Sequence, residues 1–80
     1  MKSREGYKGY VIVARSHDLN DGGFAAEFSV EEHHADGLLE TEFYLPDTLP
    51  TQDSAIDAAI QAGRQKIDAG FEGGRAIVNG

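Results

Sequence analysis

Residues 51–70, TQDSAIDAAIQAGRQKIDAG, decide the fold because they contain both ends of a helix and its buried face. Thr51 is the expected N-cap, and Asp53 in the first turn complements the helix dipole. Gly70 suits the position just after the last helical turn. The apolar and small residues recur at the spacing of one helix face: Ile56, Ala59, Ile60, Gly63 and Ile67. The stretch therefore predicts one amphipathic helix.

Three runs with the alternation of β-strands precede this helix, at residues 7–16, 24–32 and 38–45. Pro46 is expected to end the third run because it removes a backbone donor. Asp36-Gly37 is a strong signal for a hairpin turn. Short connections favour an antiparallel meander with the second strand in the centre. We expect an α+β domain over residues 1–71, a three-stranded antiparallel meander with one C-terminal helix packed on one face, followed by a flexible Gly-rich tail at 72–80.

Alternation also divides the strand residues between two faces of the predicted sheet. Ile12 and Ala14 share one face with Phe28, and the helix is expected to cover this face. Small helix residues such as Ala59 and Gly63 would let the helix lie close to the sheet. Phe28, on the central strand, is the expected anchor of the core, with Phe24 and Phe43 beside it.

Composition limits the classes of partner and the cellular setting. The 80 residues include 14 acids, 7 bases and no cysteine, for a formal charge of −7. Nucleic-acid binding needs clustered Lys and Arg, so we expect no nucleic-acid partner and no anionic membrane, and a basic protein is favoured. No apolar run approaches the length of a membrane span or forms the core of a signal peptide. These features predict a cytoplasmic protein of bacterial type.

Candidate catalytic and metal-binding residues are present but badly placed. His17 and the His33-His34 pair would lie at opposite ends of the second strand, about 30 Å apart, as solvated loop residues. Ser16-His17-Asp18 has the residue types of a catalytic triad, but consecutive positions cannot adopt its geometry. The paired carboxylates of the outer face lie on a flat sheet without a cleft. We therefore expect no enzyme activity, no cofactor and no metal site.

The sheet face that the helix leaves uncovered is the remaining candidate site. It would present an apolar stripe with an acidic rim, which is typical of a docking surface and also of a thin sheet with a few exposed valines. The edge of the run at 7–16 is the freer one for pairing with a second chain, including a second copy in a homodimer. The candidate interaction face consists of Val11, Val13, Arg15, Ala25, Glu27, Glu40, Glu42 and Tyr44.

The run Tyr7-Lys8-Gly9-Tyr10, the long hairpin and the helix start Thr51-Gln52-Asp53-Ser54-Ala55-Ile56 resemble small uncharacterised proteobacterial proteins with a β-β-β-α fold. That resemblance covers about residues 6 to 71 and implies a fold without a function. The helix start with Thr51 and Ala55 is more distantly similar to HicB-type antitoxins, which bind a small basic toxin. The Pro and Gly-Cys signature of that family between the second and third strands is missing, as is an appended DNA-binding segment.

Three functions follow as hypotheses. The first is a small non-enzymatic protein-interaction module that uses the helix-free face or an edge of its sheet. The second is an antitoxin-like acidic inhibitor of a basic partner. The third is an accessory protein that binds a small ligand or a metal.

Overall fold

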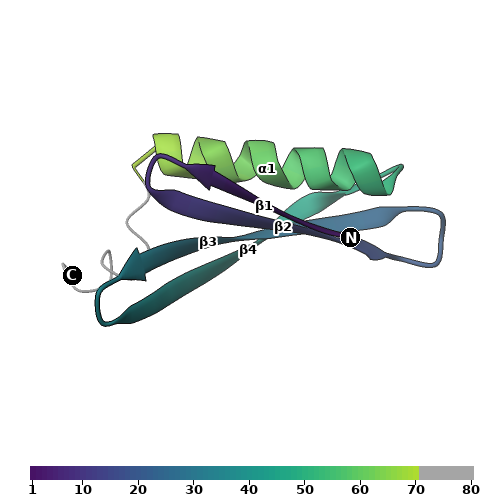
Figure 1. Cartoon of the computed structure of the whole chain (residues 1–80). Helices are drawn as coiled ribbons and strands as arrows, with labels where there is room; N and C mark the ends of the chain where they lie inside the picture. The colour runs from purple at the N-terminus through teal and green to yellow at the C-terminus, as the bar shows by residue number, and fades with distance from the viewer. Residues whose placement is uncertain (71–80) are drawn as a thin grey trace.

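The computed structural model describes residues 1–70 and shows an antiparallel sheet with one helix packed along one face (Figure 1). The strands are β1 (Lys2–Tyr7), β2 (Tyr10–Asp18), β3 (Phe24–His34) and β4 (Gly37–Leu49), and the helix is α1 (Gln52–Asp68). The strands lie in the order β1-β2-β3-β4, and each pairs antiparallel with its neighbour. The predicted α+β class and the helix after the sheet are confirmed. Residue 71, the last of the predicted domain, and the predicted tail at 72–80 lie outside the described residues.

The sheet has four strands in the described chain, so the prediction of three is wrong. The run at 7–16 breaks at Lys8-Gly9, where both residues have positive φ, 50° and 86°. This is the backbone of a type I′ turn, which suits a two-residue hairpin. The turn folds β1 back along β2 from Tyr7↔Tyr10 to Lys2↔Arg15. As a result, the strand that was expected to have a free edge is paired on both sides.

Pro46 does not end the last strand, contrary to the prediction. Glu27 pairs with Tyr44 and Ala25 pairs with Thr48, so the three residues 45–47 lie opposite Ala26 alone. Pro46 therefore lies in a bulge, where the ladder is already interrupted and a missing N–H costs little. β4 resumes its pairing beyond the bulge and ends at Leu49, beside Phe24.

The ends of α1 agree with the sequence. The Thr51 hydroxyl accepts a hydrogen bond from the Ser54 N–H at 3.0 Å, and the Ser54 hydroxyl accepts one from the Thr51 N–H at 3.1 Å. This reciprocal pair is a capping box. At the other end Gly70 has a φ of 95°, and its N–H donates to the Ile67 carbonyl at 3.1 Å. The helix is therefore closed at both ends by residues of its own sequence.

The core lies between α1 and the middle of the sheet, chiefly over β2 and β3. Phe28 is 4% exposed, and its ring stacks on Phe43 with centroids 5.0 Å apart, as expected of the core anchor. α1 approaches β2 so closely that a Cβ on Gly63 would lie 2.7 Å from the Ile12 Cγ2 atom. The small face of the helix is thus a steric requirement of the packing. The fully enclosed core residues come from all these elements: Ile12, Ala14, Val30, Ala55 and Ala59.

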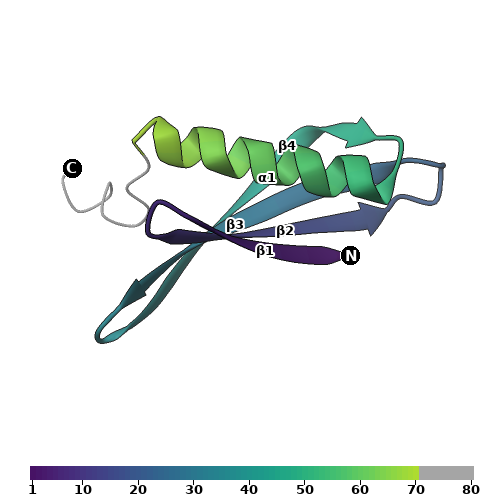
Figure 2. The same ribbon diagram turned by 45° about the horizontal axis from the view of Figure 1, so that its top comes forward.

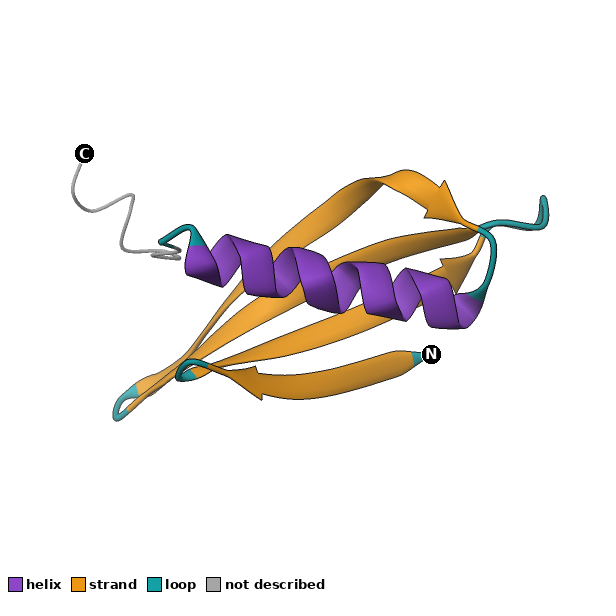
Figure 3. Ribbon diagram, turned by 90° about the horizontal axis from the view of Figure 1, so that it is seen from above, coloured by secondary structure: helices purple, strands orange, loops and turns teal. Residues whose placement is uncertain are grey.

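The β3–β4 hairpin extends past the helix. Figure 2 shows its tip projecting away from α1, below the turn between β1 and β2. Figure 3 shows α1 crossing the strands obliquely, with β4 forming one edge of the sheet and β1 the other. The two-residue turn is Ala35-Asp36, because His34 pairs with Gly37, one residue earlier than the predicted Asp36-Gly37. This arrangement leaves much of β4 outside the area that the helix protects.

Candidate functional site

The strand register places all eight candidate residues on the sheet face opposite α1, which we call the helix-free face. Rows of paired residues cross the strands, for example Arg4, Val13, Ser29 and Glu42 from β1 to β4. The same face also holds Arg4, Ser29 and Glu31, which are not among the eight candidate residues. The predicted residues brought together here are Val11, Val13, Arg15, Ala25, Glu27, Glu40, Glu42 and Tyr44.

The centre of the helix-free face is closed to solvent, although no element of the described chain covers it. Val13 is 1% exposed and Ser29 is fully buried. Long charged side chains lie across them and form ion pairs between strands. The predicted apolar stripe is therefore not an open surface at Val13.

Arg4 forms the first of these bridges. Its guanidinium on β1 donates to both carboxylate oxygens of Glu31 on β3, at 2.9 and 3.2 Å, and so passes over β2. The His33 ring nitrogen lies 3.1 Å from the same carboxylate. The hydrogen bonds from Arg4, helped by His33, hold the pKa of Glu31 below its usual range even though the residue is buried. Glu31 is thus an ionised structural residue at neutral pH.

A second bridge joins β2 to β4. The Arg15 guanidinium lies 3.7 Å from Glu40 Oε2, and the Ser29 hydroxyl donates to the same oxygen at 2.9 Å. Since β3 runs between these strands, Arg15 covers Ser29. Near the other end of the face, His17 lies 2.5 Å from the Glu27 carboxylate. Most acids of the helix-free face are therefore held by a hydrogen bond or an ion pair with a neighbouring side chain.

Glu42 and Tyr44 on β4 differ from these paired residues. Tyr44 is 70% exposed, and its hydroxyl donates to Glu42 at 3.2 Å, which raises the pKa of Tyr44 above its usual range. Glu42 forms no ion pair with a cation of residues 1–70. An exposed aromatic ring beside an uncompensated carboxylate is a surface that a partner protein can recognise.

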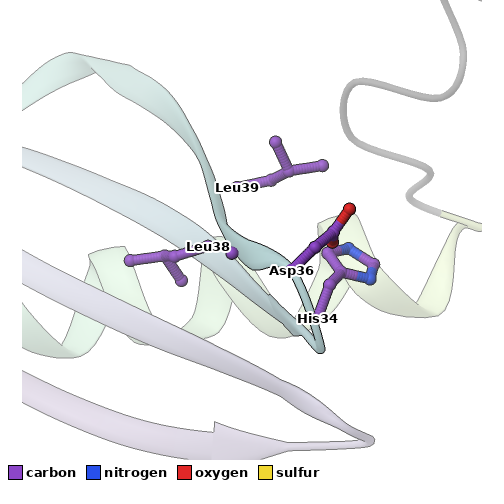
Figure 4. A pocket seen from close by; sticks show the side chains of 5 residues that line it. His34, Asp36, Leu38 and Leu39 are labelled. Atoms are coloured by element: carbon purple, nitrogen blue, oxygen red, sulfur yellow. The ribbon is translucent and has the colours of Figure 1, made fainter.

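Leu38 and Leu39 add exposed apolar surface at the start of β4, where they are 53% and 45% exposed. They line a shallow pocket with His34, Asp36 and Gly37, and Figure 4 shows the labelled side chains around the hairpin turn. The sequence interpretation missed these leucines as surface residues. The sequence feature that indicates their exposure is their position next to the hairpin turn, where the helix does not cover the sheet.

Ion pairs on the other side of the sheet hold β1 against α1. The Arg64 guanidinium donates to Glu5 at 2.7 Å, and the hydroxyl of Tyr7 and the amine of Lys8 both donate to the Asp68 carboxylate. The hydrogen bonds from Lys8 and then Tyr7 lower the pKa of Asp68, and Asp68 in turn raises the pKa of Tyr7. These contacts fix the β1 edge.

The candidate catalytic and metal residues stay apart. Ser16 is buried on the helix side, whereas His17 lies on the helix-free face against Glu27. His33 and His34 end β3 and are exposed strand residues, where loop residues were predicted, and His17 lies at the opposite end of the sheet. Within residues 1–70, no three His, Asp or Glu side chains are grouped so that they could hold a metal ion. The same part of the chain has no helix with the length and apolar character needed to span a membrane.

Comparisons with known proteins find no matching family model, no significantly similar curated protein and no significantly similar solved structure.

Proposed function

We propose that this protein is a cytoplasmic, non-enzymatic protein-interaction module that binds a partner through β4 and the adjoining helix-free face. The observation that carries the proposal is Tyr44, which is 70% exposed beside Glu42 while the acids around them are paired. Exposed aromatic residues are enriched where proteins bind each other. The centre of the helix-free face is closed to solvent, whereas β4 exposes its side chains, so a partner would bind along β4.

The chemistry of the carboxylates supports a non-enzymatic role. A general acid needs a raised pKa, whereas Arg4 lowers the pKa of Glu31. Glu27 and Glu40 are each held by a neighbouring side chain, His17 and Ser29. These groups stabilise the sheet and are poorly placed to exchange protons with a substrate.

A quantitative capture experiment tests the proposal. The wild-type protein and the variants Tyr44→Lys and Gln61→Lys are immobilised and exposed to lysate of the native cells. Both substitutions add one positive charge at an exposed position, but Gln61 lies on the polar side of α1. We expect a captured protein to be lost with Tyr44→Lys and retained with Gln61→Lys. Retention with Tyr44→Lys would contradict the proposal.

An antitoxin-like inhibitor is the second candidate, because β4 carries Glu40, Glu42 and Asp47 without any Lys or Arg. Its partner would be a small basic protein that is toxic when expressed alone. Co-expression of a neighbouring gene of this type with the wild-type protein and with Tyr44→Lys tests it. Rescue of growth by the wild-type protein alone is the expected result.

A further inference from the structure

We propose that the open edge of β4 binds an extended segment of a partner protein as a fifth strand, and that this segment alternates basic and apolar residues. This inference rests on the proposed function and names the chemistry of its partner. The relevant stretch of β4 is residues 38–45, before the bulge at Pro46.

The backbone of this stretch is suited to strand addition. β4 is the last strand of the sheet, so within residues 1–70 no strand pairs with its outer edge. Eight residues at about 3.3 Å each give an edge of roughly 26 Å. Main-chain hydrogen bonds along such an edge provide affinity, and alternate side chains provide specificity. The bulge ends the regular ladder and sets one limit of the site.

Charge on the helix-free side selects a basic partner. Glu40 and Glu42 are both exposed and lie two residues apart, so they point to the same side. Glu42 has no cation partner in the described chain, and Glu40 has only Arg15 at 3.7 Å. Side chains on an added strand would lie about 5 Å from them. Lys or Arg at alternate positions of the partner would therefore face both carboxylates.

The opposite side of the same edge favours apolar residues. Leu39 is 45% exposed there, and Thr41 and Phe43 continue the row along β4. The Lys66 amine lies 4.9 Å from the centre of the Phe43 ring, so a basic partner residue at this point would meet a like charge. An apolar side chain would instead cover Leu39. The partner segment that fits this edge therefore alternates basic and apolar side chains.

A second copy of this chain fits the edge less well. Two β4 strands paired about a two-fold axis would bring the Glu40 and Glu42 carboxylates of one copy against those of the other, with β4 providing no cation. The β1 edge of another copy offers Lys2 and Arg4, but the Arg4 guanidinium is already paired with Glu31. A different, basic partner satisfies the charges of β4 more completely.

Amide chemical shifts and hydrogen exchange of the isotope-labelled full chain test this inference with three synthetic eight-residue peptides. The first alternates Lys and Val, the second alternates Glu and Val, and the third is the Lys–Val peptide with every amide N-methylated. The third peptide keeps the charges and removes the backbone donors. We expect only the first peptide to shift the amides of 38–45 and to slow their exchange.

Charge variants provide the matched controls. Glu42→Lys should weaken binding of the Lys–Val peptide, because it replaces an attraction between surface charges with a repulsion. The loss should be only about three- to tenfold, because a surface charge pair contributes little free energy. Asp57→Lys makes the same charge change on the exposed side of α1 and should leave binding unchanged. Strand addition would be overturned if the N-methylated peptide bound as tightly as the Lys–Val peptide. It would also be overturned if the amide shift changes were spread over all acidic surfaces of the chain. Association of the chain with itself that slows the exchange of the amides of 38–45 would overturn it in favour of a second copy.

The two proposals fail in different ways. If the peptides do not bind β4 but Tyr44→Lys still abolishes capture from lysate, strand addition is wrong and the interaction module stands. If capture does not depend on Tyr44, the proposed function fails whatever the peptides do.

Discussion

Gly63 lies where α1 comes closest to the sheet, and its missing side chain sets that distance. A Cβ at this position would lie 2.7 Å from Ile12 Cγ2 and within 3.2 Å of two further Ile12 atoms. We expect Gly63→Ala to lower the free energy of unfolding by about 1–2 kcal/mol, because the steric clash outweighs the better helix propensity of Ala. Urea unfolding measures this change. In an Ile12→Ala background the same substitution should be neutral or stabilising, and an equal loss in both backgrounds would refute the contact.

Phe28 is expected to be the most costly side chain to truncate. It is 4% exposed and stacks on Phe43. Phe28→Ala should lower the free energy of unfolding by about 3–5 kcal/mol. Tyr44→Ala removes an aromatic ring that is 70% exposed, and it should cost less than about 0.5 kcal/mol. A loss below about 1 kcal/mol for Phe28→Ala would contradict the core described above.

The Arg4–Glu31 pair should contribute stability that depends on pH. Because the folded-state pKa of Glu31 is lowered, its contribution is present above the unfolded pKa, about 4.3, and is lost as the pH falls through the folded pKa. Arg4→Met should cost about 1–2 kcal/mol at neutral pH. The difference from wild type should narrow at acid pH. Urea unfolding of both proteins between pH 7 and about pH 3 measures this difference in the free energy of unfolding. A difference as large at about pH 3 as at pH 7 would argue against this pair.

The β1–β2 turn determines whether the fourth strand forms. Gly9 has a φ of 86°, a conformation that costs other residues about 1–2 kcal/mol, so Gly9→Ala should destabilise the fold by that amount. Gly6 is a matched control within β1, since an added Cβ there meets no atom within 4 Å. Gly6→Ala should change stability by less than about 0.5 kcal/mol. Thermal unfolding of both variants compares them, and equal losses would exclude the turn as the cause.

The elements differ in how much of each could be predicted from the sequence. α1 was predictable because Thr51, Asp53 and Gly70 act locally, within one turn of the helix ends. β1 was missed because Ser3 and Glu5 face α1 without an apolar pattern. The partner of Glu5 is Arg64, which lies far along the chain in α1. The Lys8-Gly9 turn was the available local signal. The continuation of β4 past Pro46 depends on a bulge that only the register with β3 reveals.

At the scale of the whole molecule, alternation predicted which residues share the helix-free face but not which of them are accessible. Val13 and Tyr44 both belong to it, yet one is 1% exposed and the other 70%. The difference arises from ion pairs that cross a strand, such as Arg4–Glu31, and these depend on the register of three strands. Charge is also unevenly distributed, because β1 carries Lys2 and Arg4 beside Glu5, whereas every charged residue of β4 is an acid. The open, acidic β4 edge is the part of the site that sequence reasoning undervalued.

Site-specific photo-crosslinking in native cells tests the central claim most directly, namely that a partner protein binds at β4. A photoreactive amino acid is incorporated at position 44 in one version of the full chain and at position 61, on the exposed side of α1, in another. We predict a crosslinked product with a second protein from position 44 and none from position 61. Crosslinking from position 61 alone, or equally from both positions, would contradict the account.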